Sequence, residues 1–177
     1  MTEPKDAAQP TDAVEKTASK AAKAAPKRKG MWSTGSGDTS GYGGIEREIY
    51  RPTPSQRPFG GWFDEVVDRL IELVDGVSDD MVVIDRDEMT IHLRAEHLLD
   101  AVKTLRDDAH LRFETCVSVS GVHYPEQAGA ELHVVYHLLS MTHNRRLRLE
   151  VACPEEQPHV PSVVATYPMA DWHERET

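Results

Sequence analysis

Cysteine is scarce in this chain. Only Cys116 and Cys153 occur, far apart and outside any Cys-x-x-Cys spacing. A disulfide framework and a structural zinc site both need more ligands or closer spacing, so neither is expected. An iron–sulfur cluster usually takes four thiolate ligands, so we expect this chain to hold none by itself. The two thiols fit folding in the reducing cytosol.

Long apolar runs are also missing. No segment approaches the ~18 consecutive apolar residues that a membrane span needs. The lysines near the N-terminus are followed by no apolar segment, so this region does not resemble a secretory signal. We therefore expect any membrane association to come through partner proteins only.

Positive charge is sparse in most of the chain, whose formal net charge is −10. Residues 61–177 hold ten Lys and Arg against twenty-three Asp and Glu, whereas residues 1–60 hold ten against seven. A strongly acidic body argues against a nucleic-acid-binding face. Docking on a basic protein surface remains open.

Motifs for catalysis and cofactor binding are absent as well. The sequence has neither a Gly-x-Ser-x-Gly nucleophile motif nor the Asp-x-Asp-x-Asp-Gly calcium loop, and no strand precedes its glycine clusters Gly35–Gly37 and Gly41–Gly44. Glu174, Arg175 and Glu176 could form a general acid–base group, but no nucleophile lies near them, so an interface role is favoured. We assign no catalytic, cofactor-binding or metal-ligating residue.

Two histidines, His133 and His137, have a spacing that would suit a metal site on a helix. The surrounding segment reads as a strand, which would separate the two rings by ~13 Å at ~3.3 Å per residue. Zinc requires its ligands within ~2.1 Å of one centre. The sequence therefore predicts two edge or half-exposed histidines rather than a shared metal.

Residues 1–60 read as a disordered tail. Residues 1–30 are rich in Ala, Lys and Pro, residues 33–44 are rich in Gly and Ser, and residues 51–58 hold three prolines. Such compositions bury too little apolar surface to offset the entropy lost on ordering. A folded domain is predicted over residues 61–177.

Apolar periodicity predicts the elements of this domain in the order α-β-β-α-β-β-β-α. A helix from Trp62 shows one apolar stripe, and Gly76 is a plausible C-cap. The later elements are strands 81–85 and 89–93, a helix over 95–107, strands 112–122, 130–141 and 145–153, and a final helix from Pro168. We predict an α+β fold with two layers, in which helices cover one face of a mainly antiparallel or mixed sheet.

The first of the three later strands shows a regular alternation. Within residues 112–122, the pattern places Phe113, Thr115, Val117 and Val119 on one face of the sheet and Cys116 on the other.

The final helix is the most informative segment. Pro168 can begin a helix, and Asp171 and Arg175 then form an acid-then-base pair four residues apart. One helix face would carry Met169, Trp172, His173 and Glu176. No glycine cap or basic last turn ends the helix before Thr177, so we expect the chain to be truncated there and Trp172 to be partly uncovered.

These C-terminal residues resemble a known family. The run from Val160 to Thr177 is similar to that of the C subunit of bacterial NADH–quinone oxidoreductase, the 30 kDa subunit of respiratory complex I. The matching positions are Ser162, Ala170, Trp172, Glu174, Arg175 and Glu176. The resemblance covers about residues 62–177. His123 departs from the acidic residue usual in the family, and Tyr167 from a common tryptophan.

The resemblance implies a role. The complex carries electrons from NADH through FMN and iron–sulfur clusters to quinone and couples this to ion translocation. The C subunit is expected in the peripheral arm on the cytoplasmic side of the cell membrane, packed against the quinone-site D subunit and near the B subunit, without a cofactor of its own. Trp172, Glu174, Arg175 and Glu176 carry over only as structural and interface residues.

Two other interpretations remain open at this point. The chain could be the equivalent subunit of a membrane-bound hydrogenase or of a quinone oxidoreductase fed by another donor. It could also be a free-standing metal- or ligand-binding α+β domain that uses His133 and His137. The strand geometry disfavours the second.

Overall fold

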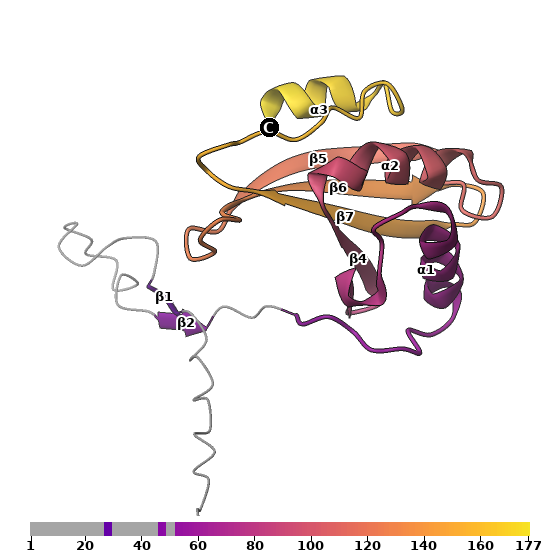
Figure 1. Ribbon diagram of the computed structural model, residues 1–177, viewed down its shortest axis with the longest axis horizontal. Coiled ribbons are helices and arrows are strands. Elements are labelled where there is room, and N and C mark those ends of the chain that lie inside the picture. The colour runs from indigo at the N-terminus through magenta and orange to yellow at the C-terminus, as the bar shows by residue number, and fades with distance from the viewer. Residues whose placement is uncertain (1–26, 30–45, 49–51) are drawn as a thin grey trace, which may run out of the picture. The chain divides into compact units, whose positions relative to one another are not determined.

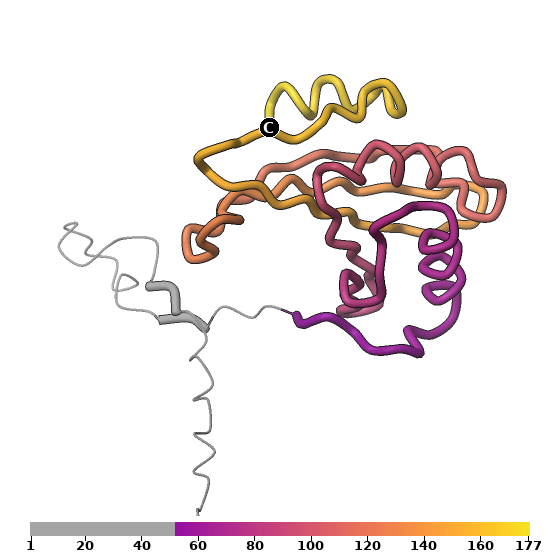
Figure 2. Tube along the Cα trace, viewed as in Figure 1, coloured from indigo at the N-terminus to yellow at the C-terminus, as the bar shows by residue number. Residues whose placement is uncertain are grey.

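The computed structural model describes residues 27–29, 46–48 and 52–177 (Figure 2). The chain divides into two compact units, Met1–Ile49 and Tyr50–Thr177. In the first unit, β1 (Lys27–Lys29) pairs antiparallel with β2 (Glu46–Glu48). Most of the predicted disordered tail, residues 1–60, lies outside the described residues.

The second unit contains the predicted elements in the predicted order (Figure 1). The helices are α1 (Trp62–Leu73), α2 (Leu98–Asp107) and α3 (Ala170–Glu176), with 3₁₀ turns at Asp79–Met81 and Ala95–His97. The strands are β3 (Val82–Asp85), β4 (Glu88–Leu93), β5 (Thr115–His123), β6 (Leu132–Ser140) and β7 (Arg145–Cys153). The α+β fold is confirmed.

The five strands form one mixed sheet in the order β3-β4-β7-β6-β5. Neighbouring strands are antiparallel except β4 and β7, which run parallel. A parallel pair needs a long crossover, and the chain between these two strands supplies it with α2, β5 and β6.

One face of the sheet forms the core. In β7, Leu147, Leu149 and Val151 are buried, whereas Arg146 and Arg148 alternate with them on the other face. Buried residues of α1, α2 and the segment 163–170 join the same hydrophobic cluster. Figure 1 shows α2 and α3 on the same side of β5, β6 and β7. The two-layer arrangement therefore follows from the period-two pattern of the strands.

The predicted alternation in β5 is wrong at one point. Cys116 is fully buried, whereas Val117 is 50% exposed. The register against β6 shifts between Cys116 and Ser118, which marks a β-bulge. A bulge adds one residue to a strand and reverses the facing of those beyond it, so Cys116 and Val119 both reach the core.

Residues 52–60, assigned to the tail on composition, make contacts with the domain. The Ser55 amide donates to the Val82 carbonyl at 2.8 Å. The Arg57 guanidinium forms an ion pair with Asp79 at 2.7 Å, and Phe59 packs against the core cluster. The described part of this segment thus lies along α1 and β3 rather than apart from them.

Gly76 serves a different purpose from the predicted C-cap. Helix α1 ends at Leu73 with Val74 as its cap, and Gly76 follows with φ +83°. A Cβ atom at this position would overlap the ring of His97. Two constraints therefore require glycine here: the left-handed backbone and the close approach of an imidazole.

We predict that Gly76→Ala lowers the free energy of unfolding by about 2–3 kcal/mol, because backbone strain adds to steric overlap. Gly129→Ala is the matched control, since Gly129 also has φ +83° but no heavy atom lies within 4 Å of the added Cβ. It should cost only about 1 kcal/mol. Urea denaturation measures both, and equal losses would show that His97 yields freely.

Candidate interaction site at the C-terminal helix

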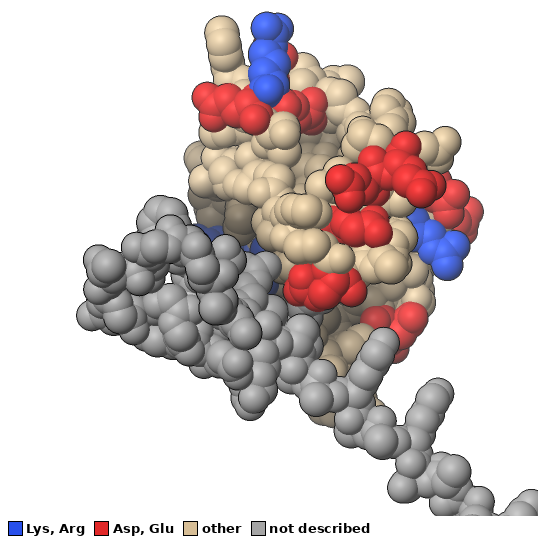
Figure 3. Space-filling model, turned by 90° about the vertical axis from the view of Figure 1, so that its left-hand side faces the viewer, with Lys and Arg blue, Asp and Glu red and all other residues tan. Residues whose placement is uncertain are grey.

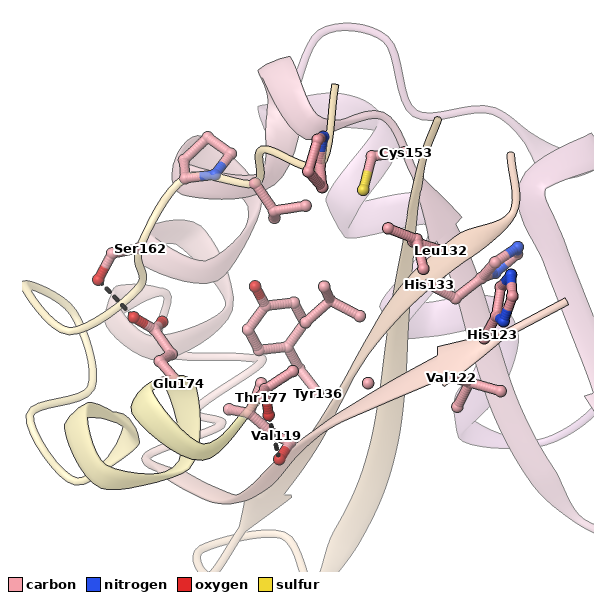
Figure 4. Close-up of a pocket in the computed structure, with 15 residues that line it drawn as sticks. Val119, Val122, His123, Leu132, His133, Tyr136, Cys153, Ser162, Glu174 and Thr177 are labelled. Atoms are coloured by element: carbon pink, nitrogen blue, oxygen red, sulfur yellow. Dashed lines mark hydrogen bonds between the residues drawn. The ribbon is translucent and has the colours of Figure 1, made fainter. Parts of the chain in front are cut away.

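Helix α3 is fastened to the preceding segment by Glu174. One carboxylate oxygen accepts a hydrogen bond from the Ser162 hydroxyl at 2.6 Å, and the other accepts one from the Val163 amide at 2.7 Å (Figure 4). Ala170, at the start of the helix, is fully buried. These positions belong to the family motif, and their geometry gives Ser162, Ala170 and Glu174 a structural role.

Tyr167 anchors the same segment to the core of the domain. Its side chain is 2% exposed, and its hydroxyl donates a hydrogen bond to the Phe113 carbonyl at 2.7 Å. Burial raises the pKa of this phenol well above its usual range, so the group stays neutral and remains a donor. The tyrosine thus fills the core and satisfies a backbone acceptor at once.

The outer face of α3 presents apolar surface to solvent. Trp172 is 71% exposed and Met169 is 54% exposed, which confirms the predicted uncovering of Trp172. The Arg175 guanidinium lies 5.4 Å from the centre of the Trp172 ring and forms the predicted ion pair with Asp171 at 3.0 Å. An exposed tryptophan stacked with arginine is a typical composition for the centre of a protein interface.

The acid–base group that the sequence disfavoured for Glu174, Arg175 and Glu176 does not form in the structure. Glu174 bonds with residues 162 and 163, whereas Arg175 bonds with Asp171. Glu176 is exposed. The three side chains therefore leave no shared position for a reacting group.

The two histidines of β6 also stay apart. His133 is 7% exposed; its Nδ1 lies 2.6 Å from a Glu150 oxygen and its Nε2 lies 2.9 Å from the Ala130 carbonyl. His137 is exposed and its Nδ1 lies 3.0 Å from the Ser118 hydroxyl. The expected edge or half-exposed setting is wrong for His133, because β6 lies between β5 and β7. The described part of the chain shows no group of three or more potential metal ligands.

Acidic groups gather on the face of the molecule shown in Figure 3. Exposed carboxylates among the described residues include Asp75, Asp100, Asp107 and Glu176. This acidic surface is suited to a partner that offers positive charge.

None of the helices in the described residues is long and apolar enough to span a membrane.

Comparison with known proteins decides the family. The model of the 30 kDa subunit of respiratory-chain NADH dehydrogenase matches residues 91–177. The C subunit of NADH-quinone oxidoreductase from Mycobacterium ulcerans is 53% identical over 175 residues, which cover 95% of this chain and 74% of that protein. The chain belongs to the family of the 30 kDa subunit of respiratory-chain NADH dehydrogenase.

A second relative and one solved structure are also similar to this chain. The C subunit of NADH-quinone oxidoreductase from a Nocardioides strain is 59% identical over 155 residues, covering 85% of this chain and 62% of that protein. Among solved structures, a trypsin-resistant fragment of Nqo5 is similar with a TM-score of 0.49 and 21% identity, covering 66% of this chain and 89% of the fragment. This member of the NADH dehydrogenase subunit family is shorter than the curated relatives it matches.

The Glu174 contacts lead to a test of this structural role. We expect Glu174→Gln to lower the free energy of unfolding by about 1–2 kcal/mol, because an amide replaces a charged acceptor shared by two donors. Ser162→Ala removes one of the two bonds and should cost about half as much. Urea denaturation ranks the variants, and a larger loss for Ser162→Ala would contradict the assignment.

Proposed function

We propose that this chain is a non-catalytic scaffold subunit in the peripheral arm of a proton-translocating NADH:quinone oxidoreductase. The observation that carries the proposal is the 53–59% identity to curated C subunits of that enzyme. The geometry supports it, because the family-motif residues fasten α3 or face outward and do not converge on a reaction centre.

In this role the chain supports electron transfer from NADH through FMN and iron–sulfur clusters to quinone, with these groups held by partner subunits. The two cysteines support the assignment of the clusters to partner subunits, since both are free, buried thiols. Burial raises the pKa of Cys116 to about 11, so this thiol is a poor source of the thiolate that a cluster needs.

The partners in this proposal are the quinone-site D subunit and the B subunit, and the chain reaches the cytoplasmic face of the cell membrane through them. The exposed Trp172 and Met169 on α3 supply the apolar centre of the docking face. The acidic surroundings favour a basic partner surface and do not suit nucleic acid.

Affinity purification of the tagged chain from solubilised membranes tests the proposal. Mass spectrometry should identify the D and B subunits in the eluate, which should reduce quinone with NADH. A complex that instead uses hydrogen or another donor would favour the related membrane-bound hydrogenase or another quinone oxidoreductase. Recovery of the chain alone would contradict a scaffold role.

A further inference from the structure

A pocket of about 510 Å³ lies between β5, β6, the segment 158–162 and the end of α3 (Figure 4). Much of its wall is apolar, with Val122, Leu132, Val134 and Val160 among the lining residues. This volume falls within the range of about 300–1,000 Å³ that is common for ligand sites. The scaffold role described above gives the pocket no occupant.

The hydroxyl of Tyr136 is an unsatisfied polar group in the wall of this pocket. The residue is 2% exposed and lines the pocket, and Figure 4 shows the ring with its hydroxyl directed into the space. Within residues 52–177, no side chain or backbone group forms a hydrogen bond with it, in contrast to the Tyr167 hydroxyl. Buried tyrosine hydroxyls usually have a partner, so the pocket has room for an incoming hydrogen-bonding group.

The charged residues around the pocket determine which charge the incoming group should carry. The Glu174 carboxylate is part of the lining, and no Lys or Arg is among the described residues that line it. Burial and, after it, the Glu174 charge raise the pKa of the Tyr136 phenol. Burial disfavours a charge of either sign, whereas the Glu174 charge disfavours an anion and favours a cation, so it is Glu174 that sets the preferred charge of a ligand here. Ser162 and Val163 use only part of the acceptor capacity of the carboxylate.

We propose that this pocket receives a lysine side chain from a partner subunit, with its methylene stem against Val122 and Val134 and its ammonium between Tyr136 and Glu174. Lysine fits because it joins an apolar stem to a compact cation with three donors. Its charge also complements the acidic excess of residues 61–177. The existence of a partner rests on the proposed function, but the pocket chemistry can be tested on this chain alone.

The probe is n-butylammonium, which is the lysine side chain without its backbone. In an NMR titration of the full chain, the amides of Gly121 and Val122 should shift saturably, with a Kd on the order of 10 mM for so small a ligand. 1-Butanol and butyrate have the same carbon skeleton with no charge or a negative charge, and should bind at least about fivefold more weakly. Absence of saturation, or equal binding of 1-butanol, would overturn the proposal while leaving the scaffold role intact.

Tyr136→Phe removes only the unmet hydroxyl. We expect it to weaken n-butylammonium binding about fivefold while leaving the Tm of the free chain unchanged or slightly raised, because no internal hydrogen bond is lost. A Tm lowered by several degrees would show that the hydroxyl has a partner in the free chain and would contradict the premise.

A photo-crosslinker at position 123 identifies the occupant in the assembled complex, since His123 is an exposed lining residue. The crosslinked partner peptide should contain lysine at or next to the attachment site. A peptide without lysine there, from an assembly that contains the other subunits, would overturn the proposal. Failure to recover any assembly would instead contradict the proposed function.

Discussion

Trp172→Ala should leave the domain folded while greatly weakening its association with partner subunits. The side chain is 71% exposed, so its removal should change the free energy of unfolding by no more than about 0.5 kcal/mol. A tryptophan at the centre of an interface contributes about 2 kcal/mol or more to binding, which corresponds to an affinity loss of about thirtyfold. The measurement is the yield of co-purified subunits at matched expression of the tagged chain.

A matched control separates interface burial from general surface change. Leu73 on α1 is 44% exposed, so Leu73→Ala also removes exposed apolar surface, but from a different helix. We expect it to retain normal co-purification. If both variants assemble equally well, the outer face of α3 is not the docking centre.

Tyr167→Ala should give the largest loss of stability among the substitutions discussed. It creates a cavity in the core and leaves the Phe113 carbonyl without its donor. Truncation of a buried aromatic side chain costs about 3–5 kcal/mol, which is a large share of the total stability of a domain. Urea denaturation of the purified chain measures the change, and a loss below about 2 kcal/mol would contradict an anchoring role.

Tyr167→Phe separates the two contributions of this side chain. The ring stays in the core, and only the hydrogen bond at 2.7 Å is lost, so we expect a cost of about 1–2 kcal/mol. Because the anchor precedes α3, we also expect Tyr167→Ala, and not Tyr167→Phe, to increase protease cleavage within residues 168–177. Equal cleavage of the two variants would show that packing of the ring does not position the helix.

The element order could be predicted from sequence because each element carries a strong local pattern. The strand over 145–153 alternates leucine and valine with charged residues, and its observed bounds agree with the prediction. The Asp171–Arg175 pair follows from helical spacing alone and is present at 3.0 Å. Trp172, which was predicted to be partly uncovered, is 71% exposed.

Features that depend on pairing between distant strands could not be predicted in this way. The β5 bulge is visible only in the register against β6, because local alternation continues through Cys116 and Val117 without interruption. The burial of His133 depends on β6 lying inside the sheet and on Glu150 and Ala130 meeting both ring nitrogens. Sequence spacing contains neither fact.

The candidate site could also be predicted only in part from the sequence. The motif residues were found from their resemblance to the family, but the sequence does not show which of them face inward. Glu174 and Arg175 are neighbours, and only the structure shows that one fastens the helix to residues 162 and 163 while the other lies over an exposed ring. The sequence does not predict the unsatisfied Tyr136 hydroxyl, because an isolated tyrosine in an apolar strand does not show whether its hydroxyl has a hydrogen-bond partner.

The most direct test of the scaffold account compares the chain alone with its assembly. Visible absorption and NADH:quinone reductase activity should be measured on the purified chain and on the complex that it brings down from membranes. The account predicts flavin and iron–sulfur absorption, together with activity, in the complex and neither in the isolated chain. Bound flavin, a cluster signal or NADH oxidation by the isolated chain would contradict it.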